Sequence, residues 1–265
     1  MESHDARPRP QVIFMPGGVL PADLAYGPLL GVLGDGVEAV AKDLEVYASD
    51  VPPHDFGLGV EVEGIRRAAN AAGFERFHLV GYSGGGASSI AFAATYPERL
   101  LSLALMEPAW AGWEGLTPEE EAVYREFERI MTLPPDEMMG AFMREQLRPG
   151  VEPPAAPAAP PGPPPPWMAR RPAGLAAFMR AFRAHRLDLD RLRAFDRPVW
   201  FALGGLSDPD YYARMSERLA GIFPRFTVEV FPERHHFDPP HRREPERVAA
   251  ALRRLWNAAE GAPAA

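Results

Sequence analysis

Cysteine is absent from the 265 residues, and lysine occurs once, at Lys42, among 28 basic residues. Without cysteine the chain can form no disulfide, no thiol nucleophile and no thiolate metal site. No apolar run approaches ~20 residues, the length that a membrane-spanning helix needs. The first ten residues are polar and lack the apolar core of a signal peptide, so we predict a cytoplasmic protein.

Positive charge is also in short supply, because 36 acidic residues outnumber the 28 basic ones and leave a net charge of −8. A mildly acidic surface disfavours nucleic acids and anionic membranes as partners. Phosphate-binding signatures are missing as well. There is no Gly-Lys-Ser/Thr, and Ser83 replaces the middle glycine that a dinucleotide-binding Gly-x-Gly-x-x-Gly requires. We therefore expect neither a P-loop nor a dinucleotide site, and no cofactor.

The chain is rich in short apolar runs that alternate with helix-like segments. The expected strands lie at 11–15, within 37–47, and at 76–80, 101–106, 198–203 and 226–231. The expected helices lie at 24–33, 60–72, 87–96, 211–222 and 245–257. Strands that alternate with helices form parallel crossover units. The sequence thus predicts an α/β fold with a doubly wound, mostly parallel sheet and flanking helices.

An insertion at 109–195 interrupts this alternation, so we predict a core of residues 1–108 and 196–265. The insertion carries Met and aromatic residues that either pack its helices together or line an apolar substrate pocket. These residues are Tyr124, Phe127, Met131, Met138, Met139, Phe142 and Met143. Its Pro- and Ala-rich stretch 149–166 cannot be helical and should run as an extended spacer. A plain connector is favoured there over a site for a proline-binding partner.

Gly81-Tyr82-Ser83-Gly84-Gly85 lies between an apolar strand and a helix of small residues. A Gly-x-Ser-x-Gly turn in that context forces the serine into strained backbone angles and lifts its hydroxyl clear of the sheet. Side chains in place of the glycines would collide with the tight turn. The pattern therefore predicts Ser83 as a nucleophile rather than as an ordinary turn residue.

A serine hydroxyl needs a base, usually a histidine that a carboxylate holds in the right tautomer. In this architecture catalytic groups gather at the carboxyl ends of the strands. Asp208 and His236 each follow a later strand, in the chain order Ser, Asp, His. Several residues compete for the two roles, and Glu107 is the main alternative acid because it also follows a strand. The other competitors are Asp210 for the acid and His235 and His241 for the base.

The histidines near the C-terminus also raise the question of a metal. His235, His236, Asp238 and His241 could in principle gather one, but no His-Glu-x-x-His helix is present. A solvated loop is the better interpretation of this segment, so no metal site is predicted.

Outside the insertion the chain resembles the α/β-hydrolase family. The resemblance rests on Pro16-Gly17-Gly18, on the turn around Ser83, on Gly205-Leu206-Ser207-Asp208 and on His236-Phe237. It implies that the insertion is a helical cap over the active site. Many members begin with two further strands, which this chain is expected to lack, and many have His-Gly where this chain has Pro16-Gly17.

The same resemblance implies an oxyanion hole. One donor is the backbone N–H of Gly84, directly after the nucleophile, and the other comes from the loop after the first strand. Gly18 is the expected second donor, with Val19 as the alternative. Each such donor stabilises the transition state by on the order of 2.7–4 kcal/mol.

These residues predict a carboxylesterase-like serine hydrolase that forms an acyl-enzyme with Ser83, His236 and Asp208. Its substrate is expected to be a small, apolar ester, because the insertion is rich in apolar side chains. Two alternatives keep the fold. A cofactor-free perhydrolase or acyltransferase would use the same triad with another acceptor, and a non-catalytic ligand-binding protein would retain the triad without chemistry.

Overall fold

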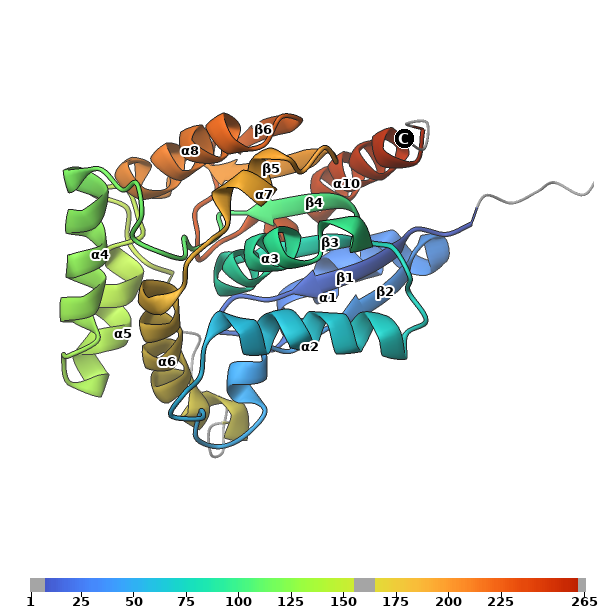
Figure 1. Cartoon of the computed structure of the whole chain (residues 1–265). Helices are drawn as coiled ribbons and strands as arrows, with labels where there is room; N and C mark the ends of the chain where they lie inside the picture. The colour runs from blue at the N-terminus through green and yellow to red at the C-terminus, as the bar shows by residue number, and fades with distance from the viewer. Residues whose placement is uncertain (1–7, 155–164, 262–265) are drawn as a thin grey trace, which may run out of the picture.

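The computed structural model describes residues 8–154 and 165–261, so most of the predicted extended spacer lies outside the described residues. One sheet of six parallel strands has the order β2-β1-β3-β4-β5-β6 (Figure 1). The strands are β1 (Gln11–Met15), β2 (Glu38–Ala41), β3 (Phe77–Tyr82), β4 (Leu100–Met106), β5 (Val199–Gly204) and β6 (Phe226–Phe231). The predicted α/β architecture is confirmed, and within the described residues the sheet is parallel throughout.

Helices cover both faces of the sheet (Figure 1). One face carries α1 (Ala22–Leu33), α9 (Pro240–Arg243) and α10 (Pro245–Glu260). The other carries α2 (Leu58–Ala71), α3 (Ser83–Thr95), α7 (Leu189–Arg193) and α8 (Arg214–Ile222). Short helical turns complete these layers: η1 (Gly34–Gly36), η2 (Glu45–Tyr47), η3 (Pro97–Arg99) and η5 (Pro209–Ala213).

The strands are buried on both faces, which explains why they read as nearly continuous apolar runs. Successive side chains of a strand point to opposite faces of the sheet. Along β1, Ile13 and Met15 therefore pack with the layer of α2 and α3. Val12 and Phe14 pack with the layer of α1 and α10. Two apolar cores result, one on each side of the sheet.

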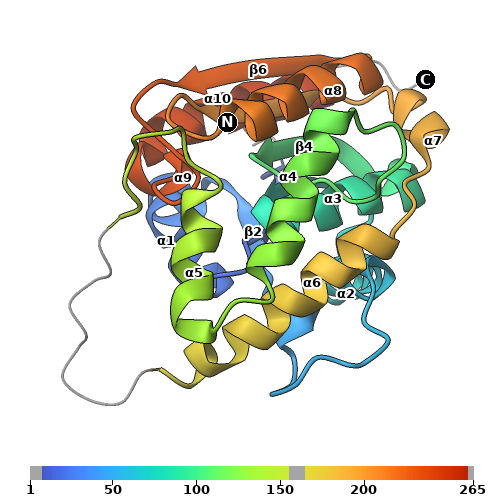
Figure 2. The same ribbon diagram turned by 90° about the vertical axis from the view of Figure 1, so that its left-hand side faces the viewer.

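The insertion between β4 and β5 forms α4 (Pro118–Ile130), α5 (Pro135–Arg144), η4 (Pro166–Arg170) and α6 (Arg171–Ala184). These helices stand beyond the carboxyl ends of the strands, and Figure 2 shows them facing the viewer. The following helix, α7, instead packs against α3 and α8 beside the sheet. The domain boundaries at residues 108 and 196 stay a prediction.

The strand expected within 37–47 is β2, and the turn η2 follows it. One expected helix takes a different local form. The helix expected at 211–222 begins as a π-type turn at Pro209, because the Asp208 carboxylate accepts the Tyr211 N–H there. Across the part of the chain that the structure describes, no helix has the length and apolar character needed to cross a bilayer.

Candidate active site

The strand order reverses between β1 and β3, because the chain continues from β1 to β2 on one side and to β3 on the other. In parallel sheets, ligands bind outside the carboxyl ends of strands at such a reversal. Gly17 and Gly18 follow β1 at this point, and Ser83 follows β3. The sheet topology therefore brings the two glycine-containing turns together.

Ser83 lies in the left-handed region of backbone conformation, with φ at 53°. The glycines around it make this turn possible. A Cβ on Gly81 would lie 2.4 Å from the Ser89 hydroxyl, and one on Gly85 would lie 2.3 Å from the Pro16 carbonyl oxygen. Because a side chain at either position would clash, the turn that raises Ser83 depends on glycine at both Gly81 and Gly85.

His236 meets Ser83 from the loop after β6. Its Nε2 lies 3.0 Å from the Ser83 hydroxyl oxygen, which is hydrogen-bonding distance. The ring is 2% exposed and stacks on Tyr212 with 4.8 Å between ring centroids. On the backbone side, the Tyr82 hydroxyl donates a hydrogen bond to the His236 carbonyl oxygen. Both tyrosines thus hold His236 against the serine.

Glu107, at the end of β4, supplies the carboxylate that faces His236. Its Oε2 lies 3.3 Å from His236 Nδ1, and its Oε1 accepts the Gly204 N–H at 2.8 Å. Its side chain is 3% exposed. Like Ser83, Glu107 has a positive φ, at 42°, which is uncommon for a residue with a side chain. The backbone is thus bent at two of the three residues that meet here.

The expected pairing of Asp208 with His236 does not occur. The Asp208 N–H donates to the Gln146 carbonyl oxygen, and the carboxylate accepts the Tyr211 N–H at 2.9 Å. These contacts direct Asp208 toward the end of α5 and the start of η5, where it caps a helical turn. Partial burial raises the pKa of the Asp208 carboxyl. The alternative acid, Glu107, occupies the position predicted for Asp208.

Gly18 and Gly84, the expected oxyanion donors, lie side by side. A Cβ on Gly84 would sit 3.9 Å from the Gly18 nitrogen. The peptide between Gly18 and Val19 is held in place, because the Gly18 carbonyl oxygen accepts the Tyr47 hydroxyl at 2.6 Å. Both glycines line the same cavity as Ser83. The arrangement can present backbone N–H groups to a negative charge that forms beside the serine.

Two cavities meet at Ser83. The first, about 40 Å³, lies between Ser83 and the helices of the insertion and is lined mainly by aromatic and aliphatic side chains. These include Tyr124, Phe127, Phe142, Leu175, Phe178, Phe182 and Tyr211. The second, about 500 Å³, is lined by Ser83, His236, Phe237 and Arg242 among others. Apolar residues of the insertion thus pack against one another and also line the cavities beside Ser83.

The other histidines near His236 have separate environments. His235 Nδ1 accepts the N–H groups of Phe237 and Asp238, so this ring supports the local turn. His241 is fully buried between Tyr26 and Tyr82, and burial lowers its pKa to about 3. Within residues 8–154 and 165–261, no three His, Asp or Glu side chains converge as metal ligands would.

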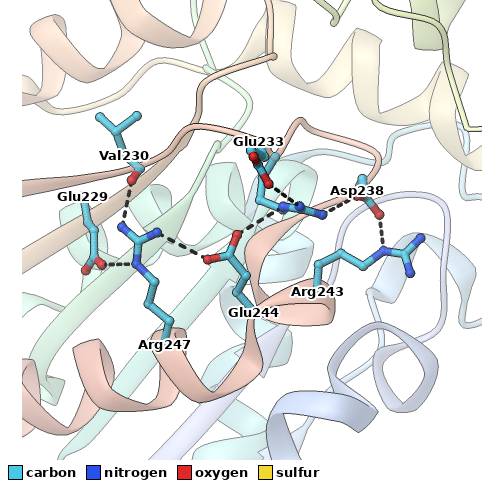
Figure 3. A network of polar contacts seen from close by, with 8 residues as sticks. Glu229, Val230, Glu233, Asp238, Arg243, Glu244 and Arg247 are labelled. Atoms are coloured by element: carbon cyan, nitrogen blue, oxygen red, sulfur yellow. Dashed lines mark hydrogen bonds and ion pairs between the residues drawn. The ribbon is translucent and has the colours of Figure 1, made fainter.

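An ion-pair network anchors the loop that carries His236 (Figure 3). At its centre, Arg234 lies 2.9 Å from Asp238 and 3.1 Å from Glu244. Arg243 also pairs with Asp238, and Arg247 lies 3.3 Å from Glu244. The network joins the loop to α9 and α10, so it restrains the backbone on both sides of the histidine.

The sequence did not point to Tyr82, Tyr212 or Gln146. Tyr82 is the variable residue of the elbow, and its ring packs 4.9 Å from that of His236. The Tyr212 hydroxyl donates to Gln146 Oε1 at 2.7 Å, which fixes the ring that stacks on His236. Only the position of Tyr82 inside the elbow could have signalled its role; Tyr212 and Gln146 come from distant segments.

A family model described as the alpha/beta hydrolase family matches residues 12–251. A 2-hydroxy-6-oxo-6-phenylhexa-2,4-dienoate hydrolase of Comamonas testosteroni is 39% identical over 85 residues, covering 31% of this chain and 30% of that protein. A 2-hydroxy-6-oxo-2,4-heptadienoate hydrolase of Pseudomonas putida is 30% identical over 128 residues, covering 43% and 46%. The matched segments thus span less than half the length of these curated relatives.

Among solved structures, an esterase of Thermogutta terrifontis superposes with a TM-score of 0.67 at 22% identity. The superposition covers 94% of this chain and 90% of the esterase. At this level of identity the likeness concerns the fold.

Proposed function

The chain belongs to the alpha/beta hydrolase family, and we propose that it is a serine hydrolase that cleaves carboxylic esters through Ser83, His236 and Glu107. One observation carries the proposal: His236 Nε2 lies 3.0 Å from the Ser83 hydroxyl while its Nδ1 lies 3.3 Å from Glu107. A nucleophile, a base and a group that orients the base are thus in contact, as covalent catalysis requires.

In the first half of the reaction, Ser83 Oγ attacks the ester carbonyl as His236 Nε2 takes the hydroxyl proton. Glu107 accepts the Nδ1–H, which sets the tautomer and stabilises the imidazolium. The N–H groups of Gly84 and Gly18 stabilise the oxyanion. His236 then gives the proton to the departing alcohol oxygen, and the acyl group stays on Ser83.

In the second half, water enters from the side that the alcohol has left. His236 Nε2 removes a proton from it, and the resulting attack on the acyl carbonyl passes through the same oxyanion site. Collapse of the intermediate returns the proton to Ser83 and releases the carboxylic acid. Every proton that moves passes through one ring nitrogen, so the orientation of His236 controls both halves.

The two cavities can be assigned to the two parts of the ester. The leaving oxygen must receive its proton from His236, so the alcohol belongs in the cavity of about 500 Å³ that His236 lines. The acyl group then faces the cavity of about 40 Å³, which Gly18 and Gly84 line. This geometry supports esters of short acyl chains with larger alcohols.

The test is Ser83→Ala with p-nitrophenyl acetate as substrate. We expect kcat to fall by at least about 10⁴-fold, because the nucleophile is lost. The melting temperature should stay nearly unchanged, since the substitution removes one oxygen beside a cavity. Full activity in the variant would refute the proposal.

Two controls separate the alternatives. A fluorophosphonate probe should label the wild type and not the Ser83→Ala variant; folded wild type that resists the probe would indicate a non-catalytic binding protein. Product analysis with methanol or hydrogen peroxide as competing acceptor would reveal an acyltransferase or perhydrolase.

A second candidate is hydrolysis of an oxo-dienoate, the compound class named in the two curated relatives. Such a substrate carries a carboxylate. Arg242 supports this candidate, because it is exposed, lines the larger cavity beside His236, and forms no ion pair within the described residues. Turnover of a 6-oxo-2,4-dienoate that exceeds that of every neutral ester tested would favour it over the ester.

A further inference from the structure

A second cavity-lining cation lies away from Ser83, at the start of α6. Arg171 is 7% exposed, yet it forms no ion pair within residues 8–154 and 165–261. Its Nε is buried and has no hydrogen-bond partner in the same residues. A buried charge without a counter-charge is unfavourable, so native structures usually pair it.

The two aromatic rings closest to the Arg171 guanidinium carry no negative charge. Its guanidinium lies 3.8 Å from the centroid of the Tyr47 ring and 5.1 Å from that of Trp167. The adjacent Arg170 is already paired with Asp50 at 2.8 Å. Both arginines stand at the N-terminal end of a 14-residue helix, where the helix dipole disfavours cations and favours anions.

Arg171 lines a cavity of about 330 Å³ between the start of α6 and the η2 segment. Figure 1 shows these two elements next to each other, on the side of α6 away from α4. The volume lies in the range of small-molecule sites. The remaining lining is largely apolar or aromatic, from Pro21, Leu44, Tyr47, Ala48 and Trp167. Such a cavity has room for an apolar body next to the cation.

Two carboxylates also line the cavity and restrict the charge of an occupant. Asp43 accepts the Ala22 N–H at 2.7 Å, and Glu45 lies 2.9 Å from Lys42 and 3.2 Å from Arg67. Because Asp43 has no cationic partner among the described residues, a multiply charged anion such as phosphate would be repelled. A single carboxylate matches the planar guanidinium and limits this repulsion.

We propose that this cavity is a second ligand site, which binds a small organic monocarboxylate through Arg171, with the apolar body of the ligand against Trp167 and Leu44. The site does not depend on the function proposed for Ser83. It does share one residue with that centre: Tyr47, which packs on Arg171, donates its hydroxyl to the Gly18 carbonyl oxygen at 2.6 Å. An occupied cavity therefore contacts the residue that fixes the oxyanion loop.

The experiment measures binding of 4-fluorobenzoate to the full chain by fluorine NMR, with Arg171→Met as the test variant. We expect saturable binding to the wild type and at least a tenfold weaker affinity in the variant. Ala48→Trp, which puts a large ring at an exposed position of the cavity lining and leaves Arg171 in place, should weaken binding similarly. If Arg171→Met does not fold, the affinity of Ala48→Trp for 4-fluorobenzoate tests the proposal.

Arg253→Gln is the matched control, because Arg253 is exposed on α10 and lines neither this cavity nor the two cavities at Ser83. Its affinity for 4-fluorobenzoate should stay within twofold of the wild type. The proposal is overturned if Arg171→Met and Ala48→Trp both bind as the wild type does, or if Arg253→Gln loses as much affinity as they do. Equal binding of 4-fluorobenzamide or of inorganic phosphate would equally contradict a monocarboxylate site.

Discussion

At the scale of single residues, Glu107 shows how one side chain can serve two partners. One carboxylate oxygen accepts the Gly204 N–H, and the other faces His236 Nδ1. Because the first contact fixes the carboxylate plane, the second oxygen has a defined direction. Asp208 makes its own contacts to Tyr211 and Gln146 and belongs to a separate turn. Which carboxylate contacts His236 therefore depends on which loop end reaches the histidine.

We predict that Glu107→Gln lowers kcat by about 10²- to 10⁴-fold. The amide oxygen would stay on the Gly204 N–H, so the NH₂ group would face His236 Nδ1. That contact favours the tautomer with hydrogen on Nε2, which cannot act as a base toward Ser83. Steady-state kinetics on p-nitrophenyl acetate would measure the effect.

Asp208→Asn is the matched control, since asparagine can still accept the Tyr211 N–H. Its kcat should stay within about threefold of the wild type, because its side chain makes no contact with His236 in the described residues. A large loss in Asp208→Asn together with an active Glu107→Gln would return the role to Asp208.

His241 makes stability depend on pH. Burial lowers its pKa to about 3, whereas an unfolded histidine titrates near 6.5. As pH falls from about 6.5 toward 3, the unfolded chain takes up a proton that the folded chain does not, so stability is lost over this window. The lowered pKa of His241 should thus reduce the free energy of unfolding by up to about 4 kcal/mol as the pH falls through this window.

His241→Leu is expected to reduce that destabilisation, because it removes the titrating group without breaking a hydrogen bond of the described residues. Urea denaturation at pH 7 and at pH 4 would measure the difference for both proteins. An unchanged difference between the two pH values in the variant would show that His241 is not responsible.

At the scale of elements, each loop at the carboxyl edge of the sheet is held by a different device. The elbow after β3 forms because Gly81 and Gly85 have no side chain that would clash there. The bend after β4 is held by the hydrogen bond from the Gly204 N–H to Glu107. The loop after β6 depends on charge, through the network around Arg234 (Figure 3). Because the side chain of Arg234 is only 20% exposed, its ion pairs are less screened by water than surface pairs.

We therefore predict that Arg234→Met destabilises the fold by about 1–3 kcal/mol, since it leaves Asp238 and Glu244 without a central partner. It should also lower kcat, because the loop carries His236. Arg254→Met is the matched control: that side chain is 67% exposed and pairs with Glu229 at 3.4 Å. Thermal denaturation and ester kinetics would test both variants, and equal effects in the two would argue against a special role for the network.

At the scale of the whole molecule, the helices of the insertion stand in front of the sheet in Figure 2, and residues of both line the cavity at Ser83. The sheet contributes Ser83, Glu107 and His236, and the insertion contributes Phe142, Phe178 and other apolar side chains of the smaller cavity. Under the proposed function, the residues of the chemistry and those that contact the acyl group would thus come from different parts of the chain.

This division predicts that substrate length can be changed from the cap alone. The wild type should prefer acetyl or propionyl over octanoyl p-nitrophenyl esters, because the acyl cavity holds only about 40 Å³. Phe182→Ala should shift the preference toward longer acyl chains, since it removes a ring that lines this cavity. Ratios of kcat/KM across chain lengths would measure the shift; an unchanged profile would place the acyl group in the larger cavity.

The sequence by itself determined the α/β fold and the elbow around Ser83. These depend on local patterns: apolar runs define the strands, and a tight turn requires glycine wherever a side chain would collide. Such signals can be read from neighbours in the chain because the forces behind them act over a few residues.

Only the tertiary structure placed Glu107 rather than Asp208 beside His236, and only it brought Tyr212 to the histidine and Gln146 to Tyr212. Both acids follow a strand, so spacing cannot distinguish them. The choice depends on hydrogen bonds between distant segments, from Gly204 to Glu107 and from Asp208 to Gln146, which form once the loops have packed together. Likewise, the burial of Arg171 beside Tyr47 results from the packing of α6 on η2, two elements far apart in the chain.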